Sequence, residues 1–347
     1  MNGELKKRIQ DNRILQQEID MIKLRPRYLL LEVSNACNDK CIFCANQKMT
    51  RKRKSMDYDI GKKALIDGAE WGITEVGFYA TGEPLLNANL ESLISLAKNN
   101  GYSYTYLTTN GALLNEERAE KLVSAGIDSI KFSVNASNNI DYLFIHGKDD
   151  FDQVIDNIKK TKEICIRRGS KTKLYVSCVM TRQTKDKCKQ LQDILGEFVD
   201  EIVYQPAVNF SGCMREIGEY LSIDGKGEYK PMSGICPYPF SHAIVTCEGY
   251  LSLCCLDYQN YLAVADLHEC SLKEAWECKI AENMRKNILD DTVDGTLCDN
   301  CLRNRSNNIS PLRRDLCTEV SMEEWGMKCE LVTERIAEWE KTSKKHN

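Results

Sequence analysis

Two features are absent from this sequence: a long hydrophobic run and an excess of charge of one sign. No apolar stretch approaches the ~20 residues that a membrane span needs, and no signal peptide is recognisable. The 47 basic and 51 acidic residues leave a net charge of −4. This balance argues against a general nucleic-acid or membrane-surface protein, so we expect a cytoplasmic protein with neither partner.

Cysteine, in contrast, is abundant, with 17 among 347 residues. In a chain without a secretory signal, these cysteines do not suggest a disulfide framework. They suggest metal ligands and buried thiols in a reducing cytosol. The chain is also longer than one compact core usually needs, so we expect one large domain and one smaller one.

Three cysteines form the most informative cluster of the sequence. Cys37, Cys41 and Cys44 have the spacing C-x3-C-x2-C and follow an apolar run at residues 28–33 that predicts a buried strand. Thiolates suit iron–sulfur clusters, and a [4Fe–4S] cluster normally takes four of them. Three ligands from one loop leave one iron open to a substrate or cofactor. The spacing alone also fits a zinc site with a distant fourth ligand, or three free thiols.

Strand and helix patterns alternate from residue 27 to about residue 209. Six strands are predicted, within residues 28–33, 75–80, 103–108, 127–134, 173–180 and 201–208. Repeated strand–helix units imply a parallel sheet with right-handed crossovers. Six units fall short of the eight in a closed barrel, so we predict an α/β fold with an open, partial (β/α)6 barrel. Active groups in such sheets gather at the carboxyl ends of the strands, where the cysteine loop lies.

The pattern changes after about residue 214. Two short alternating runs, residues 243–246 and 250–254, predict a β-hairpin, and a helix follows. Cys236, Cys254, Cys298 and Cys301 supply four thiolates, which is a closed set suited to a structural or electron-conducting site. Four thiolates fit zinc as well as iron. We therefore predict a small cysteine-rich α+β domain after the barrel.

These patterns divide the chain into five predicted segments. They are an N-terminal helical extension (1–26), the partial barrel (27–214), a linker (215–235), the cysteine-rich domain (236–302) and a C-terminal helical extension (303–347).

The cysteine loop resembles the signature of the radical S-adenosylmethionine (radical SAM) enzymes, because Phe43 precedes the last of Cys37, Cys41 and Cys44. In that family the open iron binds S-adenosylmethionine (SAM), and its reductive cleavage gives a 5′-deoxyadenosyl radical that removes a substrate hydrogen. The family also shares the partial barrel. The resemblance implies a SAM-binding [4Fe–4S] cluster and an external one-electron donor such as flavodoxin or ferredoxin.

Further positions resemble the family at consecutive strand ends. Thr81-Gly82-Glu83-Pro84 resembles a Gly-Gly-Glu segment that receives the methionine amino group, although Thr81 replaces the first glycine. A turn beginning at Thr108, and the pair Ser133 and Asn135, resemble segments near the carboxylate and ribose of SAM. The SAM contacts that the resemblance implies are Phe43, Gly82, Glu83, Thr108, Asn110, Ser133 and Asn135.

The C-terminal cysteines resemble the SPASM module of radical SAM proteins, together with Cys236-Pro237, Gly249 and Trp276. The full module adds cysteines soon after the C-x2-C pair, and residues 302–316 contain none. The chain therefore resembles the shortened "twitch" form, which implies one auxiliary [4Fe–4S] cluster. Its implied ligands are Cys236, Cys254, Cys298 and Cys301.

The short module resembles that of aminocyclitol dehydrogenases. The resemblance thus implies oxidation of an alcohol on a sugar or aminocyclitol-like small molecule, with the auxiliary cluster as electron acceptor. One alternative is a ribosomal-peptide maturase that epimerises or crosslinks its substrate. Such enzymes often carry an extra N-terminal recognition domain, whereas about 26 residues precede the first predicted strand here. An iron–sulfur electron carrier is a more distant alternative, because the SAM positions have no role in one.

Substrate-facing residues are the least defined part of the prediction. Cys178, near the end of the fifth strand, is predicted to face the barrel interior, where a thiol can donate a hydrogen atom; the competing interpretation is a small core residue. Cys255 is interpreted as a packing residue, and the basic run at residues 51–54 as a solvated loop. The candidate bases lie at or near strand ends: Glu32, Tyr79, Tyr204, Gln205 and Arg215.

Overall fold

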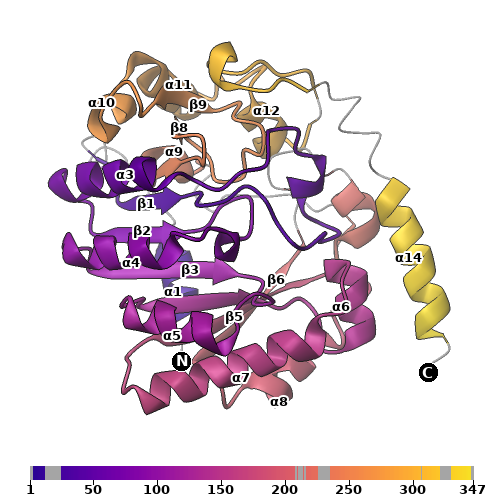
Figure 1. Ribbon diagram of the computed structural model, residues 1–347. Coiled ribbons are helices and arrows are strands. Elements are labelled where there is room, and N and C mark those ends of the chain that lie inside the picture. The colour runs from indigo at the N-terminus through magenta and orange to yellow at the C-terminus, as the bar shows by residue number, and fades with distance from the viewer. Residues whose placement is uncertain are drawn as a thin grey trace.

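A single curved sheet runs through the molecule in this computed structural model (Figure 1). The structure describes residues 3–11, 25–207, 209, 214, 216–225, 235–305, 307–320 and 330–344. Within these residues the sheet has nine strands in the order β6-β5-β4-β3-β2-β1-β7-β8-β9. Six neighbouring strands, β1 to β6, are parallel, as predicted for a partial barrel.

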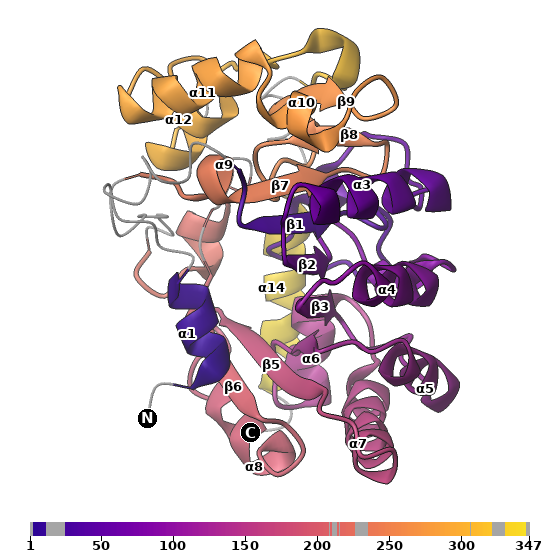
Figure 2. The same cartoon turned by 90° about the vertical axis from the view of Figure 1, so that its left-hand side faces the viewer.

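The six barrel strands follow chain order across the sheet. They are β1 (Tyr28–Leu31), β2 (Glu75–Phe78), β3 (Tyr104–Thr109), β4 (Ser129–Ser133), β5 (Lys173–Met180) and β6 (Glu201–Pro206). The helices that connect them cover the outer face (Figure 2). They are α3 (Tyr58–Glu70), α4 (Leu90–Asn99), α5 (Glu116–Ser124), α6 (Asn139–His146), α7 (Phe151–Arg167) and α8 (Leu191–Leu195).

Strand alternation separates a core from a lumen. On β4, Ile130 and Phe132 are fully buried in the core between the sheet and its helices. Lys131 lies between them and therefore projects to the opposite face, into the barrel lumen. The same alternation places Leu29 and Leu31 of β1 in the outer core, and leaves Leu30 on the lumen side.

The C-terminal module continues the barrel sheet instead of standing apart from it. The first strand of the predicted hairpin, β7 (His242–Val245), pairs in parallel with β1, with Tyr28 opposite His242. It then pairs antiparallel with β8 (Tyr250–Ser252), and β9 (Ala263–Asp266) completes the sheet. The helices of the module are α9 (Tyr238–Ser241), α10 (Leu272–Trp276), α11 (Lys279–Leu289) and α12 (Leu297–Leu302). The predicted fold class is confirmed, but the sequence did not predict β9 or the parallel β1–β7 pair.

Two helices near the chain ends lie against the barrel from different sides. The N-terminal helix α1 (Glu4–Asp11) lies beside β6 at the open side of the barrel (Figure 2), where Glu201 accepts hydrogen bonds from the first N–H groups of the helix. The C-terminal helix α14 (Glu330–Ser343) packs on α6, where Trp339 donates to Asp141 at 2.7 Å. None of the described helices combines the length and hydrophobicity that a membrane span requires.

Candidate active site

The cysteine loop lies at the carboxyl end of β1 and is fixed by the last turn of α6. Two backbone hydrogen bonds hold it, from Lys40 N to His146 O at 2.9 Å and from Ile42 N to Ile145 O at 2.8 Å. Arg335 of α14 also donates to the Lys40 carbonyl at 2.7 Å. The backbone between the three cysteines is therefore held by two helices that are distant in sequence.

The chemistry of these three thiols fits a metal cluster. Burial raises the pKa of Cys37 to about 12 and raises the pKa values of Cys41 and Cys44 above their ordinary value. The neighbouring thiolates add to the effect at Cys37 and Cys41. Three buried thiolates at this spacing need positive charge nearby, and a soft metal centre supplies it. The donor set therefore fits the predicted iron–sulfur cluster.

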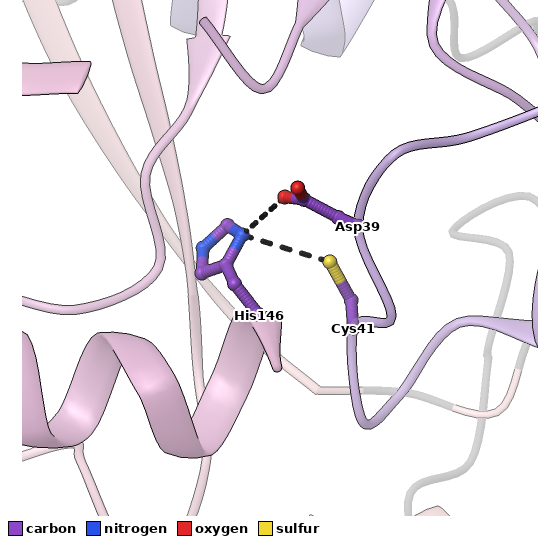
Figure 3. A group of neighbouring side chains, drawn as sticks. All are labelled: Asp39, Cys41 and His146. Carbon is purple, nitrogen blue, oxygen red and sulfur yellow. Dashed lines mark hydrogen bonds and ion pairs between the residues drawn. The ribbon is translucent and has the colours of Figure 1, made fainter. Parts of the chain in front are cut away.

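A buried histidine lies beside the cysteine loop, as Figure 3 shows. His146 Nδ1 lies 2.9 Å from the Asp39 carboxylate and 3.7 Å from Cys41 Sγ. The backbone N–H of Asn135 points at the other ring nitrogen, Nε2, at 3.3 Å. Since an N–H must donate, Nε2 is the acceptor and Nδ1 carries the proton that bonds Asp39. His146 thus orients the loop, and the sequence analysis missed it.

The segment after β2 packs directly on the chain that leads into the cysteine loop. A Cβ atom at Gly82 would collide with the carbonyl oxygens of Ser34 and Ala36, so only glycine fits there. Glu83 N donates to Ala36 O at 2.8 Å. The Glu83 carboxylate accepts hydrogen bonds from Thr109 Oγ1 at 2.7 Å and from the backbone N–H of Asn110 at 2.9 Å. Burial raises the pKa of Glu83 to about 7.

The other strand-end residues also make contacts that join neighbouring loops. Asn110 Nδ2 donates to Asn38 Oδ1, inside the cysteine loop, at 3.0 Å. Asn135 Oδ1 accepts from Val179 N at 2.8 Å and so ties β4 to β5. Ser133 is half-buried at the end of β4. These contacts bring the strand ends together around the cysteine loop, whereas the SAM contacts at Phe43, Gly82, Glu83, Thr108, Asn110, Ser133 and Asn135 stay predictions.

The second cysteine set also assembles from separate elements. Cys236 precedes α9, Cys254 follows β8, and Cys298 and Cys301 lie on α12. Burial raises the pKa of Cys254 well above its ordinary value, and the thiolate charges of the other three add to the effect. Asp257 braces the loop by accepting from Leu262 N at 2.6 Å. Four thiols thus interact in one buried place, which fits the predicted closed cluster site.

Cys255 and Tyr258, which follow Cys254 in the chain, connect the second cysteine set with the barrel. Tyr258 Oη lies 3.7 Å from Cys44 Sγ. Cys255 packs with Leu30 and Ile244 on the lumen side of the sheet, so its packing role is as predicted. Its position, however, is between the auxiliary cysteines and the barrel lumen.

The lumen itself is lined by tyrosines around one lysine. Its cavity has a volume of about 110 Å³. Lys131 Nζ lies 5.6 Å from the centre of the Tyr79 ring, and Tyr106 packs beside Tyr79. At the strand starts, Arg8 of α1 pairs with Glu75 and closes the cavity. Of the predicted bases, only Tyr79 lines this cavity among the described residues.

Glu32 does not serve as a free base, because its carboxylate is fully engaged. It accepts from Arg51, from Thr81 Oγ1 and from Cys247 N at 3.0 Å. Arg51 is 4% exposed, so the interpretation of residues 51–54 as a solvated loop is wrong at its first residue. Arg53 donates to Asn46 at 2.7 Å but stays exposed, as does Lys52.

Cys178 faces the outer core and not the barrel interior. Tyr175 of the same strand lines the lumen, and a residue three positions further points to the opposite face. The Cys178 thiol lies against Cys188, and this contact together with burial raises the pKa of Cys178. Tyr204 is opposite Cys178 on β6 and shares its face. The prediction of a hydrogen donor at Cys178 is therefore corrected.

The structure does not test the remaining predictions. Arg215 lies outside the described residues, and so do residues 226–234 of the predicted linker. Gln205 is half-buried on β6, and the structure gives it no partner that tests a role as base. The predicted segment boundaries stay predictions.

Comparison with known proteins defines the class of this chain. Residues 31–194 match the profile of the Radical SAM superfamily, and residues 236–302 match that of SPASM, an iron–sulfur cluster-binding domain. The chain belongs to the radical SAM superfamily and carries a SPASM domain. Its cofactors are accordingly SAM, the [4Fe–4S] cluster of the radical SAM domain and auxiliary iron–sulfur in the SPASM domain.

Individual relatives are more distant. A probable GTP 3',8-cyclase of Methanococcus maripaludis is 28% identical over 183 residues, which are 52% of this chain and 61% of the relative. The chain thus spans about three fifths of that relative's length.

Among solved structures, BtrN in complex with AdoMet and 2-DOIA has a TM-score of 0.55 at 20% identity, covering 84% of this chain and 97% of BtrN. SuiB of Streptococcus suis bound to S-adenosylmethionine has a TM-score of 0.58 at 16% identity, covering 76% of this chain and 68% of SuiB. At these identities, both similarities establish the fold alone.

Proposed function

We propose that this chain is a radical SAM oxidoreductase that oxidises an alcohol of a sugar or aminocyclitol-like small molecule. One observation carries the proposal: Cys255, next to an auxiliary cysteine in the chain, lies close to the lumen residues Tyr79 and Lys131. Cys255, the neighbour of Cys254, packs with Leu30 and Ile244 and against Tyr79 on the lumen side. An electron acceptor held by the auxiliary thiolates is therefore adjacent to a substrate in the lumen.

Oxidation of an alcohol to a carbonyl removes one hydrogen atom, one proton and one electron. When bound, SAM and the first cluster supply the radical that takes the hydrogen atom, and the auxiliary cluster accepts the electron. Cys37, Cys41 and Cys44 would hold the first cluster, and Cys236, Cys254, Cys298 and Cys301 the second. The lumen walls would exclude water from the reacting carbon.

The way the lumen is closed supports a small substrate. The Arg8 guanidinium stacks on Tyr104, 3.6 Å from the ring centre, and pairs with Glu75. Helix α1 therefore covers the end of the barrel where the strands begin. The remaining cavity of about 110 Å³ suits a compact group better than a long peptide segment. The likeness in fold to BtrN, over nearly its whole length, also supports a small-molecule substrate.

The experiment is a substrate screen with the cluster-loaded, reduced enzyme. Sugars and cyclitols deuterated at their carbinol carbons are incubated with SAM, and mass spectrometry follows 5′-deoxyadenosine and carbonyl products. We expect deuterium in 5′-deoxyadenosine and one carbonyl product per deoxyadenosine formed. Deuterium transfer without any carbonyl product would contradict the proposal.

A ribosomal-peptide maturase is the second candidate, and the similarity of fold to SuiB supports it. It predicts an epimerised or crosslinked peptide product and no carbonyl on a small molecule. Because the curated relatives include GTP 3',8-cyclases, GTP belongs in the same screen as a test of redox-neutral cyclisation. An external one-electron donor such as flavodoxin or ferredoxin remains part of the proposal.

A further inference from the structure

The barrel lumen contains a positive charge that no carboxylate in the described part of the chain balances. Four charged residues line the cavity: Arg8, Arg27, Glu75 and Lys131. Glu75 pairs with Arg8, and Arg27 lies at the exposed rim. Lys131 is in the middle of β4. Its Nζ lies 5.6 Å from the centre of the Tyr79 ring, which is a cation–π contact. A lysine kept in such a place costs desolvation energy unless an anion binds there.

An unused hydrogen-bond donor lies next to this lysine. Thr108 and Lys131 are opposite each other in the register of β3 and β4, so their side chains leave the sheet on the same face. The Thr108 hydroxyl is buried and has no hydrogen-bond partner among the described residues. Both residues line the same cavity. An ammonium and a hydroxyl side by side, each without an acceptor, form a pair of donors for one oxyanion.

We propose that Lys131 and Thr108 form a subsite in the barrel lumen that binds an anionic oxygen group of the substrate, a carboxylate or a phosphate. The proposal rests on the proposed function and narrows its substrate class to hydroxy compounds that carry an acidic group. A fixed ammonium repels the amino groups of an aminocyclitol, so the substrate would be an acidic sugar or hydroxy acid instead.

The depth of the pair separates it from the cofactor site, and the proposal replaces the predicted SAM contact at Thr108 with a substrate contact, because Thr108 lines the lumen cavity opposite Lys131. Ser133, a predicted SAM contact, lies two residues further along β4, which corresponds to about 6.6 Å of strand. The cysteine loop lies at the same carboxyl end as Ser133. Lys131 and Thr108 are therefore one layer deeper than the positions around the cluster, on the side where a substrate would lie beneath SAM.

Burial disfavours the charged form of Lys131, and a bound anion would offset this effect. Burial lowers the pKa of Lys131 from its ordinary value of 10.5, while a thiolate at Cys255 would raise it. A bound anion would also favour the charged form of the lysine.

The test uses simple anions as probes and the cluster-loaded enzyme with saturating SAM. Thermal unfolding is followed while inorganic phosphate or acetate is titrated, with chloride at matched ionic strength as reference. We expect saturable stabilisation by one of the two anions beyond that of chloride. The anion that stabilises the protein more identifies the acidic group of the substrate as a phosphate or a carboxylate.

Matched variants decide whether Lys131 is responsible. Lys131→Met keeps most of the side-chain volume and should raise the anion's dissociation constant about tenfold or more, while Lys131→Arg should retain binding. Lys121→Met, on the exposed face of α5, removes the same charge far from the lumen and should behave like the parent. Equal anion stabilisation in the Lys131→Met and parent proteins would overturn the proposal.

Two further outcomes are decisive. The same titration is repeated without SAM, and anion binding that is seen only in the absence of SAM would assign Lys131 to the carboxylate of SAM and overturn the subsite. Anion binding that persists and depends on Lys131, in an enzyme that forms no carbonyl product from any acidic sugar, would support the subsite. The same result would reject the proposed alcohol oxidation, so the two failures are distinguishable.

Discussion

Arg51 and Glu32 form a buried ion pair beneath the cysteine loop, with Nη1 3.3 Å from Oε1 and Nη2 2.5 Å from Oε2. Both side chains are about 2% exposed. Arg51 Nε also donates to Glu248, in the turn between β7 and β8, at 3.1 Å. One guanidinium therefore joins the end of β1, the chain that follows the cysteine loop and the C-terminal module.

Loss of this guanidinium should destabilise the protein strongly. In the Arg51→Met variant, Glu32 and Glu248 lose their counter-charge, and a broken buried pair typically costs about 3–5 kcal/mol. Lys54→Met is the matched control from the same basic run, because its pair with Asp57 is at the surface and contributes little. Urea unfolding measures both; similar free energies of unfolding for the two variants would refute the role given to Arg51.

Replacement of Cys37, Cys41 and Cys44 by Ala should remove one of two clusters. The anaerobically reconstituted parent is expected to hold about eight irons per chain, and the triple variant about four. The single variant Cys41→Ala should already abolish cleavage of SAM to 5′-deoxyadenosine. Iron analysis and deoxyadenosine formation are the two measurements, and a parental cleavage rate in Cys41→Ala would show that this loop does not hold the SAM cluster.

Replacement of Cys298 and Cys301 by Ala should separate two steps of the reaction. Because both lie on α12 in the closed set, SAM cleavage and deuterium transfer should continue while oxidised product disappears. Circular dichroism and retained iron in the first site must be checked first, since a metal site also contributes folding energy. A folded variant with full product formation would favour a redox-neutral reaction such as epimerisation.

Cys178→Ser should leave the product unchanged, because Cys178 lies in the outer core against Cys188. Cys255→Ser is the matched variant on the lumen side. If a thiol donates hydrogen to a substrate radical, deuterium from solvent should enter the product through Cys255 and not through Cys178. If the product of the Cys178→Ser variant no longer contained deuterium from solvent, Cys178 and not Cys255 would be the hydrogen donor.

Glu83 should make stability depend on pH. Its pKa rises from 4.5 to about 7 on folding through burial, so the folded state binds this proton more tightly than the unfolded state. The resulting stabilisation is present below pH 4.5 and is lost as the pH rises through 7, which corresponds to about 3 kcal/mol at most. Between pH 5 and 8, Glu83→Gln should therefore gain stability relative to the parent. Urea unfolding without SAM tests this; a constant difference across the range would contradict it.

The sequence predicted the six barrel strands and both cysteine sets, because short apolar strands and cysteine spacing are local signals. It could not predict that β7 pairs in parallel with β1, since a hairpin pattern contains no information on which edge it joins. Cys178 was predicted on the wrong face because the position of a strand end was judged without its lumen-facing neighbour, Tyr175.

The partners of buried polar groups were the other limit. His146 lies at the end of an apolar helix, and its contact with Asp39 spans 107 residues. Arg51 stands in a run of four basic residues that reads as solvent-exposed, and its partner Glu248 is 197 residues away. Pairings of this range depend on the tertiary fold, and nothing in the local pattern distinguishes Arg51 from Lys52 beside it.

The parallel pair of β1 and β7 has a mechanical consequence. With β7 in place, β1 is an interior strand, bonded on one side to β2 and on the other to β7. A chain truncated after residue 225 would turn β1 into an open edge, with unpaired N–H and C=O groups along the strand that leads into the cysteine loop. Open edges of apolar strands recruit other chains, so the barrel expressed alone should aggregate instead of folding as an independent catalyst.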